Sequence, residues 1–97
     1  MSVVRLIHVN VDPNHAAEAE RIWAENCAPL MIQQKGCRSE QLLKCDDVPG
    51  EYISYSEWES QADIDAYRES EAHKEIQNHS RRLQGAKAVV KCYQVMS

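Results

Sequence analysis

Four β-prone runs and two helical stretches share the 97 residues of this chain, and their order allows only a few topologies. Residues 3–11 carry β-branched and apolar side chains on both alternating faces, a pattern typical of a strand in the middle of a sheet. Further β-prone runs occupy residues 37–45, 51–58 and 86–96, and a polar turn at 46–50 separates the second run from the third. The second and third runs therefore predict an antiparallel hairpin.

The first helical stretch begins after Asp12 and Pro13, which predict an N-cap and a first-turn proline. Apolar residues then recur every three or four positions as far as Leu30, as expected for an amphipathic helix of about five turns. Pro29 lacks a backbone N–H, so we expect a kink or an early end near it. Gly36 is predicted to terminate what remains of the helix.

The second helical stretch begins with an N-capping signature, Ser60 followed three residues later by Asp63. Tyr67 belongs to the apolar edge of the short helix that follows, and a further helical run extends to Gly85. A break near Ser70 and one continuous bent helix are both compatible with the sequence.

The order strand, helix, strand, strand, helix, strand predicts an α+β fold of the ferredoxin-like βαββαβ type. Two right-handed split βαβ units would form a four-stranded antiparallel sheet with helices on one face. The length predicts a single domain over residues 1–97. Because the strands carry apolar residues on both faces, the face without helices needs a partner surface, and we expect a homodimer packed sheet to sheet.

Composition excludes several classes of partner. The net charge of −4 and the scattered Lys and Arg residues argue against nucleic acid. No apolar run approaches the roughly 20 residues of a membrane span, and the first residues do not resemble a signal peptide, so we expect a cytoplasmic protein. Cys27, Cys37, Cys45 and Cys92 have no recognisable zinc-ligand spacing, which favours free thiols and no metal site.

Three local features stand out along the chain. They are the Gly36-Cys37 pair that opens the second strand, the Trp58-Glu59-Ser60 ending of the third strand, and the Ser70-Glu71-Ala72-His73 run. Together with the order of the elements, they resemble the antibiotic biosynthesis monooxygenase family. The resemblance implies a dimeric α/β barrel with one pocket per subunit between the sheet and its own helices. Family members known as enzymes oxidise polycyclic phenols, quinols or haem with molecular oxygen, usually without a separate flavin or metal, and many others have no known activity.

The haem-degrading branch of the family relies on an Asn, a Trp and a His, the last two lying ten residues apart. In this chain Ile7 stands at the position of the Asn, and Tyr67 and Gln77 stand at those of the Trp and the His. The resemblance therefore does not extend to haem degradation by that mechanism.

Trp58 and His73 are the candidate catalytic residues. An oxygenase of this kind must hold an electron-rich ring in an apolar cavity and help to remove a phenolic proton. Trp58 would provide a wall, with a core position at the strand-to-helix corner as the alternative. His73 would act as base or hydrogen-bond partner, since imidazole exchanges protons near neutral pH, with a helix-surface position as the alternative.

Five further residues are candidates for contacting the substrate. Tyr55 and Tyr67 offer hydroxyl groups to an oxygenated ring, Trp23 would close the cavity from the first helix, and His8 and His79 would line it. Core packing or surface exposure is the alternative for each of them.

The first functional hypothesis is a cofactor-independent monooxygenase that oxidises a small aromatic quinol or phenol with O2. The second is a non-catalytic dimer that binds a small apolar molecule in the same cavity, and the third is an unusual haem-binding or haem-degrading relative. Catalysis is not established by the family resemblance alone, since one fold hosts many activities.

Overall fold

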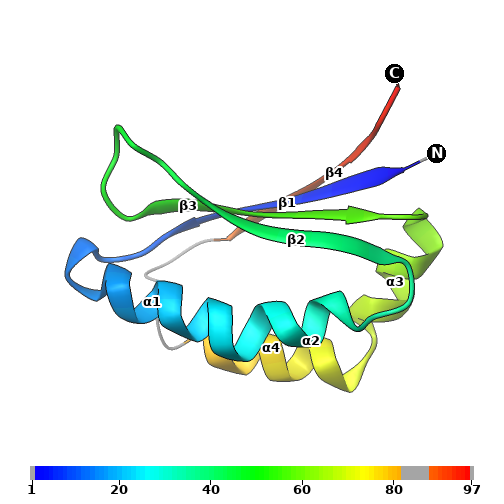
Figure 1. Cartoon of the computed structure of the whole chain (residues 1–97), viewed down its shortest axis with the longest axis horizontal. Helices are drawn as coiled ribbons and strands as arrows, with labels where there is room; N and C mark the ends of the chain where they lie inside the picture. Colours follow the sequence, from blue (N-terminus) through cyan, green and yellow to red (C-terminus); the bar gives the residue numbers. More distant parts are fainter. Residues whose placement is uncertain (1, 82–87, 97) are drawn as a thin grey trace.

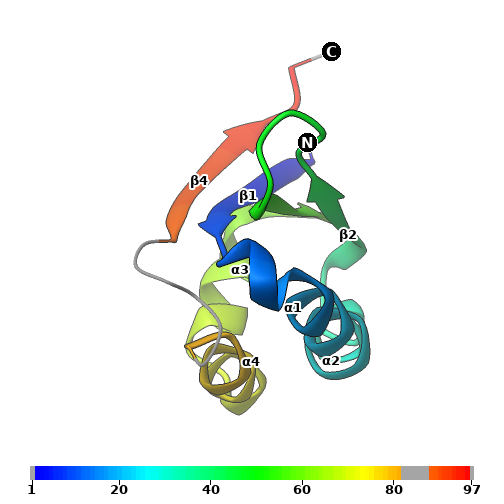
Figure 2. The same cartoon turned by 90° about the vertical axis from the view of Figure 1, so that its left-hand side faces the viewer.

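The computed structural model describes residues 2–81 and 88–96, which form a four-stranded sheet with a layer of helices on one of its faces (Figure 1). Figure 2 shows the two layers from the end, and the helices of the described residues all lie on one face of the sheet. The elements in chain order are β1 (Val3–Asn10), the 3₁₀ turn η1 (Pro13–His15), α1 (Ala16–Ile22), the π-helical turn η2 (Trp23–Cys27), α2 (Ala28–Ile32), β2 (Cys37–Lys44), β3 (Glu51–Trp58), α3 (Gln61–Arg68), α4 (Glu71–Arg81) and β4 (Val89–Gln94).

The strand order is β2-β3-β1-β4 and every neighbouring pair is antiparallel. This confirms the predicted α+β ferredoxin-like fold and the predicted hairpin of β2 with β3. It also confirms the central place of β1, which pairs with β3 on one side and β4 on the other. The predicted last strand is present over Val89–Gln94, and Gly85, the predicted end of the helical region, lies outside the described residues.

Residues on the two faces of the sheet alternate strictly along β3. Tyr52, Ser54, Ser56 and Trp58 are buried beneath the helices, and the residues between them are only half-buried. Cross-strand pairing extends this pattern to β1, where Arg5 lies opposite Ser56. The helix-facing side of β1 therefore carries its odd-numbered residues.

A β-bulge interrupts the pairing of β2 with β3 near the start of β2. Cys37 pairs with Trp58 and Ser39 pairs with Glu57, so one residue of β2 has no counterpart. As a result Cys37 and Glu40 both lie on the helix-facing side, although they are three residues apart and a regular strand would put them on opposite faces.

The first helical stretch begins as predicted and continues past Pro29. Asp12 Oδ1 accepts a hydrogen bond of 2.9 Å from the backbone N–H of Asn14. The backbone N–H of Ala28 donates to the carbonyl of Trp23, five residues earlier, in place of the usual four. This wider turn lies immediately before Pro29, whose ring and missing N–H disfavour a regular α-helical turn. The predicted disturbance at Pro29 is therefore a π-turn, and the helix extends to Ile32.

The second helical stretch is broken after Arg68. Ser60 Oγ accepts a hydrogen bond of 3.2 Å from the Asp63 N–H, which confirms the predicted N-cap of α3. Ser70 Oγ accepts from the His73 N–H at 3.2 Å and so caps the first turn of α4. The sequence allowed either a break or one continuous bent helix, and the structure has two separate helices.

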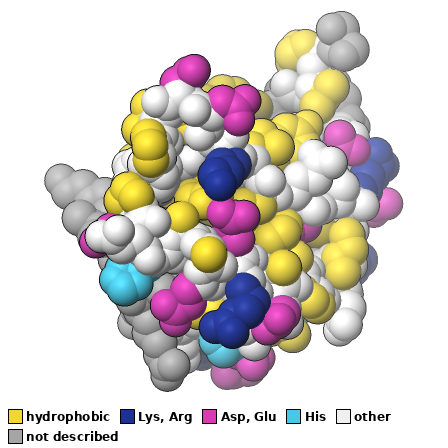
Figure 3. Space-filling view, turned by 60° about the vertical axis from the view of Figure 1, so that its left-hand side comes forward, with side chains coloured by type: hydrophobic (Ala, Val, Ile, Leu, Met, Phe, Trp, Pro, Cys, Tyr) yellow, Lys and Arg dark blue, Asp and Glu magenta, His cyan; other side chains and the backbone are white. Residues whose placement is uncertain are grey.

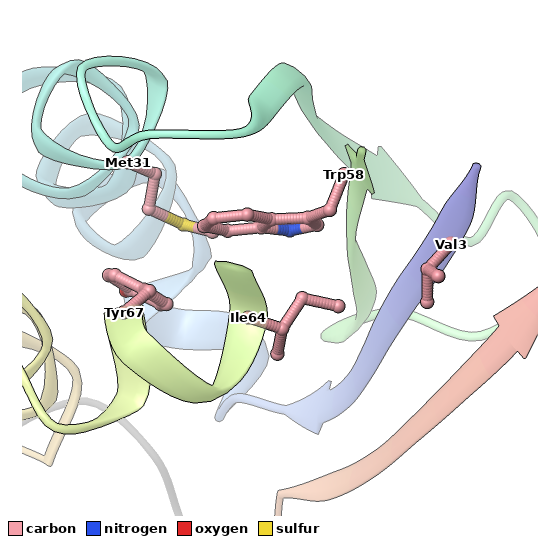
Figure 4. Close-up of a cluster of buried hydrophobic side chains, with 5 residues drawn as sticks. All are labelled: Val3, Met31, Trp58, Ile64 and Tyr67. Carbon is pink, nitrogen blue, oxygen red and sulfur yellow. The ribbon is translucent and has the colours of Figure 1, made fainter. Parts of the chain in front are cut away.

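The filled core lies where β1 begins and β3 ends. It contains Val3, Met31, Trp58, Ile64 and Tyr67, and Figure 4 shows the Met31 sulfur directed at the Trp58 ring. The Trp58 side chain is completely buried, and its ring centroid lies 5.2 Å from that of Tyr67. These residues come from the sheet and from both helical stretches, so this cluster fastens the two layers together.

Two expectations from composition can be compared with the described part of the chain. No helix there is long and apolar enough to cross a membrane. Cys37, Cys45 and Cys92 are free thiols, as predicted. Burial raises the pKa of the Cys37 thiol to about 11, so this thiol stays protonated at neutral pH.

Replacing Trp58 with Ala should lower the free energy of unfolding by about 3–5 kcal/mol, because a large buried side chain is removed and a cavity remains. Urea denaturation at a fixed protein concentration measures the loss. Ile32→Ala is the control, since Ile32 is 47 % exposed and its truncation should cost less than about 1 kcal/mol. Equal effects of the two variants would contradict the assignment of Trp58 to the core.

Candidate functional site

A cavity of about 120 Å³ lies between the helix-facing side of the sheet and the helices, next to the filled core. Its walls are mainly apolar. Ile7 and Val9 come from β1, Ile22 from α1, Met31 from α2 and Ile76 from α4. A concave, mostly apolar site with a few polar groups is the usual form of a small-molecule site.

Two polar side chains that line the cavity, Glu20 and Tyr52, contact each other, and Lys44 lies close to Glu20. The Tyr52 hydroxyl donates a hydrogen bond of 2.6 Å to Glu20 Oε2, and Lys44 Nζ lies 3.5 Å from the same oxygen. The Tyr52 hydrogen bond lowers the pKa of Glu20, and burial raises the pKa of Tyr52 to about 12. Glu20 therefore stays ionised and Tyr52 stays protonated at neutral pH. In Figure 3, which shows one face of the molecule, hydrophobic side chains reach the surface between acidic and basic ones.

Arg5 places a buried cation in the wall formed by β1. The side chain is only 4 % exposed, and it forms no ion pair within 4 Å among the described residues. Its guanidinium carbon lies 5.8 Å from the centroid of the Tyr67 ring, a distance at which the ring face attracts a cation. Burial lowers the pKa of Arg5, but an arginine with this reference value remains charged.

Glu40 lies behind the cavity wall, where the β-bulge turns it toward the helices. Glu40 Oε1 accepts a hydrogen bond of 2.7 Å from the hydroxyl of Ser54, which lines the cavity. Burial raises the pKa of Glu40 to about 7, although the Ser54 hydrogen bond, the nearby Trp23 indole and the Arg5 charge all act in the opposite direction. This carboxyl group can therefore gain or lose a proton near neutral pH.

His73 lines the cavity from the first turn of α4. Its ring packs edge-on against Tyr67, with the centroids 5.0 Å apart and the planes at 81°. Burial, followed by the positive charges of Arg5 and Arg68, lowers the pKa of His73. Its imidazole is therefore neutral at pH 7 and retains a nitrogen that can accept a proton.

The family model for antibiotic biosynthesis monooxygenases matches residues 2–79. This chain belongs to the antibiotic biosynthesis monooxygenase family. The match extends from the residue before β1 into α4. It therefore includes every residue that lines the cavity. Proteins of this family are commonly small dimers. No curated protein sequence matches this chain.

Several solved structures are similar to this family member in fold. A protein from Bordetella bronchiseptica, provisionally named an antibiotic biosynthesis monooxygenase, is 20 % identical with a TM-score of 0.90, over 99 % of this chain and 98 % of that one. SnoaB, a cofactor-independent oxygenase from Streptomyces nogalater, is 17 % identical with a TM-score of 0.84, over 99 % and 94 %. A conserved protein from Methanosarcina mazei is 15 % identical with a TM-score of 0.86, over 97 % and 92 %. At these identities the likeness concerns the fold.

Three of the residues predicted for the site lie together at the cavity of this antibiotic biosynthesis monooxygenase family protein. They are Trp23 from η2, Tyr67 from α3 and His73 from α4. The sequence placed each of them on a helical stretch, and the fold brings these stretches to the same face of the sheet. Their position at the cavity supports the predicted contact with a ligand, which stays a prediction.

The other predicted site residues do not line the cavity. Trp58 lies in the adjacent core, where its indole N–H donates a hydrogen bond of 2.9 Å to Ser56 Oγ, and this matches the alternative of a core tryptophan. Tyr55 and His8 lie on the face of the sheet away from the helices, because their strand positions alternate with those that face the cavity. His79 lies on α4 with its imidazole 4.0 Å from Glu75.

Arg5, Glu40 and Ser54 contribute polar groups that sequence reasoning did not select. Arg5 carries the clearest signal, since it is the one charged residue within the apolar run of residues 3–9. Glu40 carries no such signal, because the bulge that orients it is not encoded by a glycine or by any other recognisable residue. A Ser within a β-prone run is equally uninformative.

The carboxyl group of Glu40 should titrate near pH 7 in the folded protein, which carbon-detected NMR of labelled glutamate can measure. Glutamate in an unfolded chain titrates near about 4.3, so between these pH values the folded state binds more protons than the unfolded state. Stability should therefore fall as pH rises from about 4.5 to about 7, by up to about 3 kcal/mol.

Glu40→Gln, which cannot ionise, should remove this component of the pH dependence and leave the rest. Glu57→Gln is the control, since Glu57 lies on the opposite face of β3. Indistinguishable stability profiles of wild type and Glu40→Gln between pH 4.5 and 7 would contradict the raised pKa.

Proposed function

We propose that this protein is a cofactor-independent monooxygenase that oxidises a small aromatic quinol with O2. The observation that carries the proposal is the apolar cavity of about 120 Å³, whose polar groups include a neutral imidazole and a guanidinium. An engineered apolar cavity of roughly 150 Å³ holds benzene, so a volume of this order suits a single ring. A tetrapyrrole is several times larger, which argues against haem as the substrate.

The proposed reaction needs no other reductant, because the quinol supplies all the electrons. A quinol and O2 give a hydroxyquinone and water: one oxygen atom enters a ring C–H bond, and the other leaves as water with the two hydroxyl hydrogens. The quinol loses four electrons and O2 accepts four. Removing a hydroxyl proton makes the ring a stronger reductant toward O2, so the protein must accept a proton and stabilise the resulting anion.

The cavity offers groups for both tasks. His73 is neutral at pH 7, and we assign it as the acceptor of one hydroxyl proton. Arg5 provides a positive charge beside the ring, in a site where a low effective dielectric strengthens its attraction for an anion. Tyr67 and Trp23 supply aromatic walls. SnoaB, a structural neighbour named as a cofactor-independent oxygenase, supports chemistry without a bound flavin or metal.

Purified protein without added flavin or metal should consume O2 with single-ring quinols faster than the spontaneous oxidation. With ¹⁸O₂, one labelled oxygen should appear in the quinone product and one in water. His73→Ala should lower kcat/KM by roughly a hundredfold, the usual contribution of a general base. His15→Ala is the control, because His15 is exposed and does not line the cavity.

Binding without catalysis is the alternative outcome. A quinol that raises the melting temperature in a concentration-dependent manner but leaves the O2 trace at the spontaneous rate would show a binding protein, since ligand binding stabilises the folded state by mass action. That result would refute the monooxygenase proposal and retain the cavity as a ligand site.

We also propose that the protein functions as a homodimer packed through the face of the sheet opposite the helices. Leu43, Val89 and Tyr93 lie on this face and are 42 %, 48 % and 48 % exposed. They belong to the two edge strands, β2 and β4. An exposed apolar surface at both edges of this face is more stable when a second copy covers it.

Sedimentation velocity should give a dimer for the wild type and a monomer for Leu43→Glu combined with Tyr93→Glu, because each dimer would then bury four carboxylates. Ile32→Glu, an equally exposed position on α2, should remain dimeric. A wild-type monomer at micromolar concentration would refute the proposal.

A further inference from the structure

A buried donor lies at one wall of the cavity and has no hydrogen-bond partner among the described residues. It is the Nε–H group of Arg5, whose side chain lines the cavity. The Trp23 indole, which also lines the cavity, acts as a hydrogen-bond donor to Glu40 and so lowers the pKa of that carboxyl group. A buried donor without a partner destabilises the folded state, so such a group is rare in a folded protein.

Ser54 connects Glu40 to the cavity. Its side chain lines the cavity, and its hydroxyl donates to Glu40 Oε1 at 2.7 Å. Because that proton already points at Glu40, the Ser54 oxygen is left to accept a hydrogen bond from a group within the cavity. The wall therefore presents one acceptor, Ser54 Oγ, and one donor without a partner, the Nε–H group of Arg5.

A hydroxyl group on an aromatic ring matches this arrangement, since it donates one hydrogen bond and accepts others through the same oxygen. We propose that a ring hydroxyl of the substrate donates to Ser54 Oγ, accepts from the Nε–H group of Arg5, and loses its proton to Glu40 through Ser54. This inference rests on the proposed function, in which His73 receives the other hydroxyl proton of the quinol.

The proton transfer requires no further reactant. The O–H bond of the substrate breaks and its proton joins Ser54 Oγ, while the original Ser54 proton moves to Glu40 Oε1. The carboxylate becomes a carboxylic acid, the serine is unchanged, and the ring oxygen carries the negative charge beside the Arg5 guanidinium. Ser54 contacts the substrate, and Glu40 is the final proton acceptor.

The charged and titratable groups around Glu40 set the pH at which it can accept a proton. Arg5 from β1 favours the ionised carboxylate. The Glu40 charge acts on Tyr67 from α3 and on Cys37 from β2. The pKa of Tyr67 is raised to about 12 and that of Cys37 to about 11, so both groups stay neutral. The relay is active when Glu40 is ionised, and its rate should therefore rise as the pH passes about 7.

Binding of phenol and toluene separates recognition of the hydroxyl from catalysis, because the two molecules have nearly the same size and neither is a quinol. Wild type should bind phenol roughly tenfold or more tightly than toluene by calorimetry. Ser54→Ala should reduce this preference by several fold and leave toluene affinity unchanged. Ser39→Ala, on the other face of the sheet, should retain the wild-type preference.

Turnover of a quinol tests the relay itself. In Glu40→Gln the amide oxygen can still accept from Ser54, so KM should stay within about threefold while kcat falls roughly a hundredfold. The rise of kcat near pH 7 should disappear in this variant. Ser54→Ala should lose both affinity and kcat, and Glu57→Gln should match wild type. Thermal unfolding checks that each variant is folded.

The outcomes distinguish this inference from the proposed function. Quinol oxidation that is unchanged in rate and pH profile by Glu40→Gln would refute the relay and leave the monooxygenase standing. Selective phenol binding that depends on Ser54, without any quinol oxidation, would refute the monooxygenase and retain the hydroxyl site. Equal affinity of wild type for phenol and toluene would refute the hydroxyl site, because water would then satisfy these polar groups as well as a ligand does.

Discussion

The packing of Trp58 holds the two layers of this fold together. The indole is fully buried where β3 ends and α3 begins, and it contacts Met31 from the first helical stretch and Tyr67 from the second. Its only polar atom is bonded to Ser56, so the ring can be buried without a loose donor. Because this cluster fills one end of the space between sheet and helices, the space beyond it is free to remain a cavity.

The cavity contains polar groups that a purely structural core would avoid. Arg5 is a buried cation that forms no ion pair within 4 Å in the described part of the chain, and the half-buried Glu40 has a carboxyl group with a raised pKa. Each destabilises the folded state relative to an apolar residue of the same size. Natural proteins commonly accept such losses at sites where the same groups bind or transform a ligand. The firm core around Trp58 supplies stability that offsets them.

The fold could be predicted from sequence because hydrophobic periodicity and turn residues mark every element along the chain. The cavity walls were harder to predict, for a physical reason that differs between residues. Strand β1 is apolar on both faces, so alternation alone does not show which face the helices cover, and His8, a candidate for contacting the substrate, lies on the other face. Tyr55 of β3 lies on that face too. For His73 the sequence allowed both an inward and a helix-surface position, and only the packing of α4 on the sheet places it at the cavity.

The bulge in β2 gives the two ends of this strand separate roles. Cys37 packs against the core and Glu40 stands behind the cavity, and both face inward only because one residue between them is unpaired. Deleting that residue would force one of the two to face outward, even if every remaining side chain were kept. Chain length at this point therefore constrains the site as strongly as residue identity does. Relatives with the same fold could gain or lose an internal carboxyl group through a single insertion or deletion, a route to new activity that leaves the sheet and the helices in place.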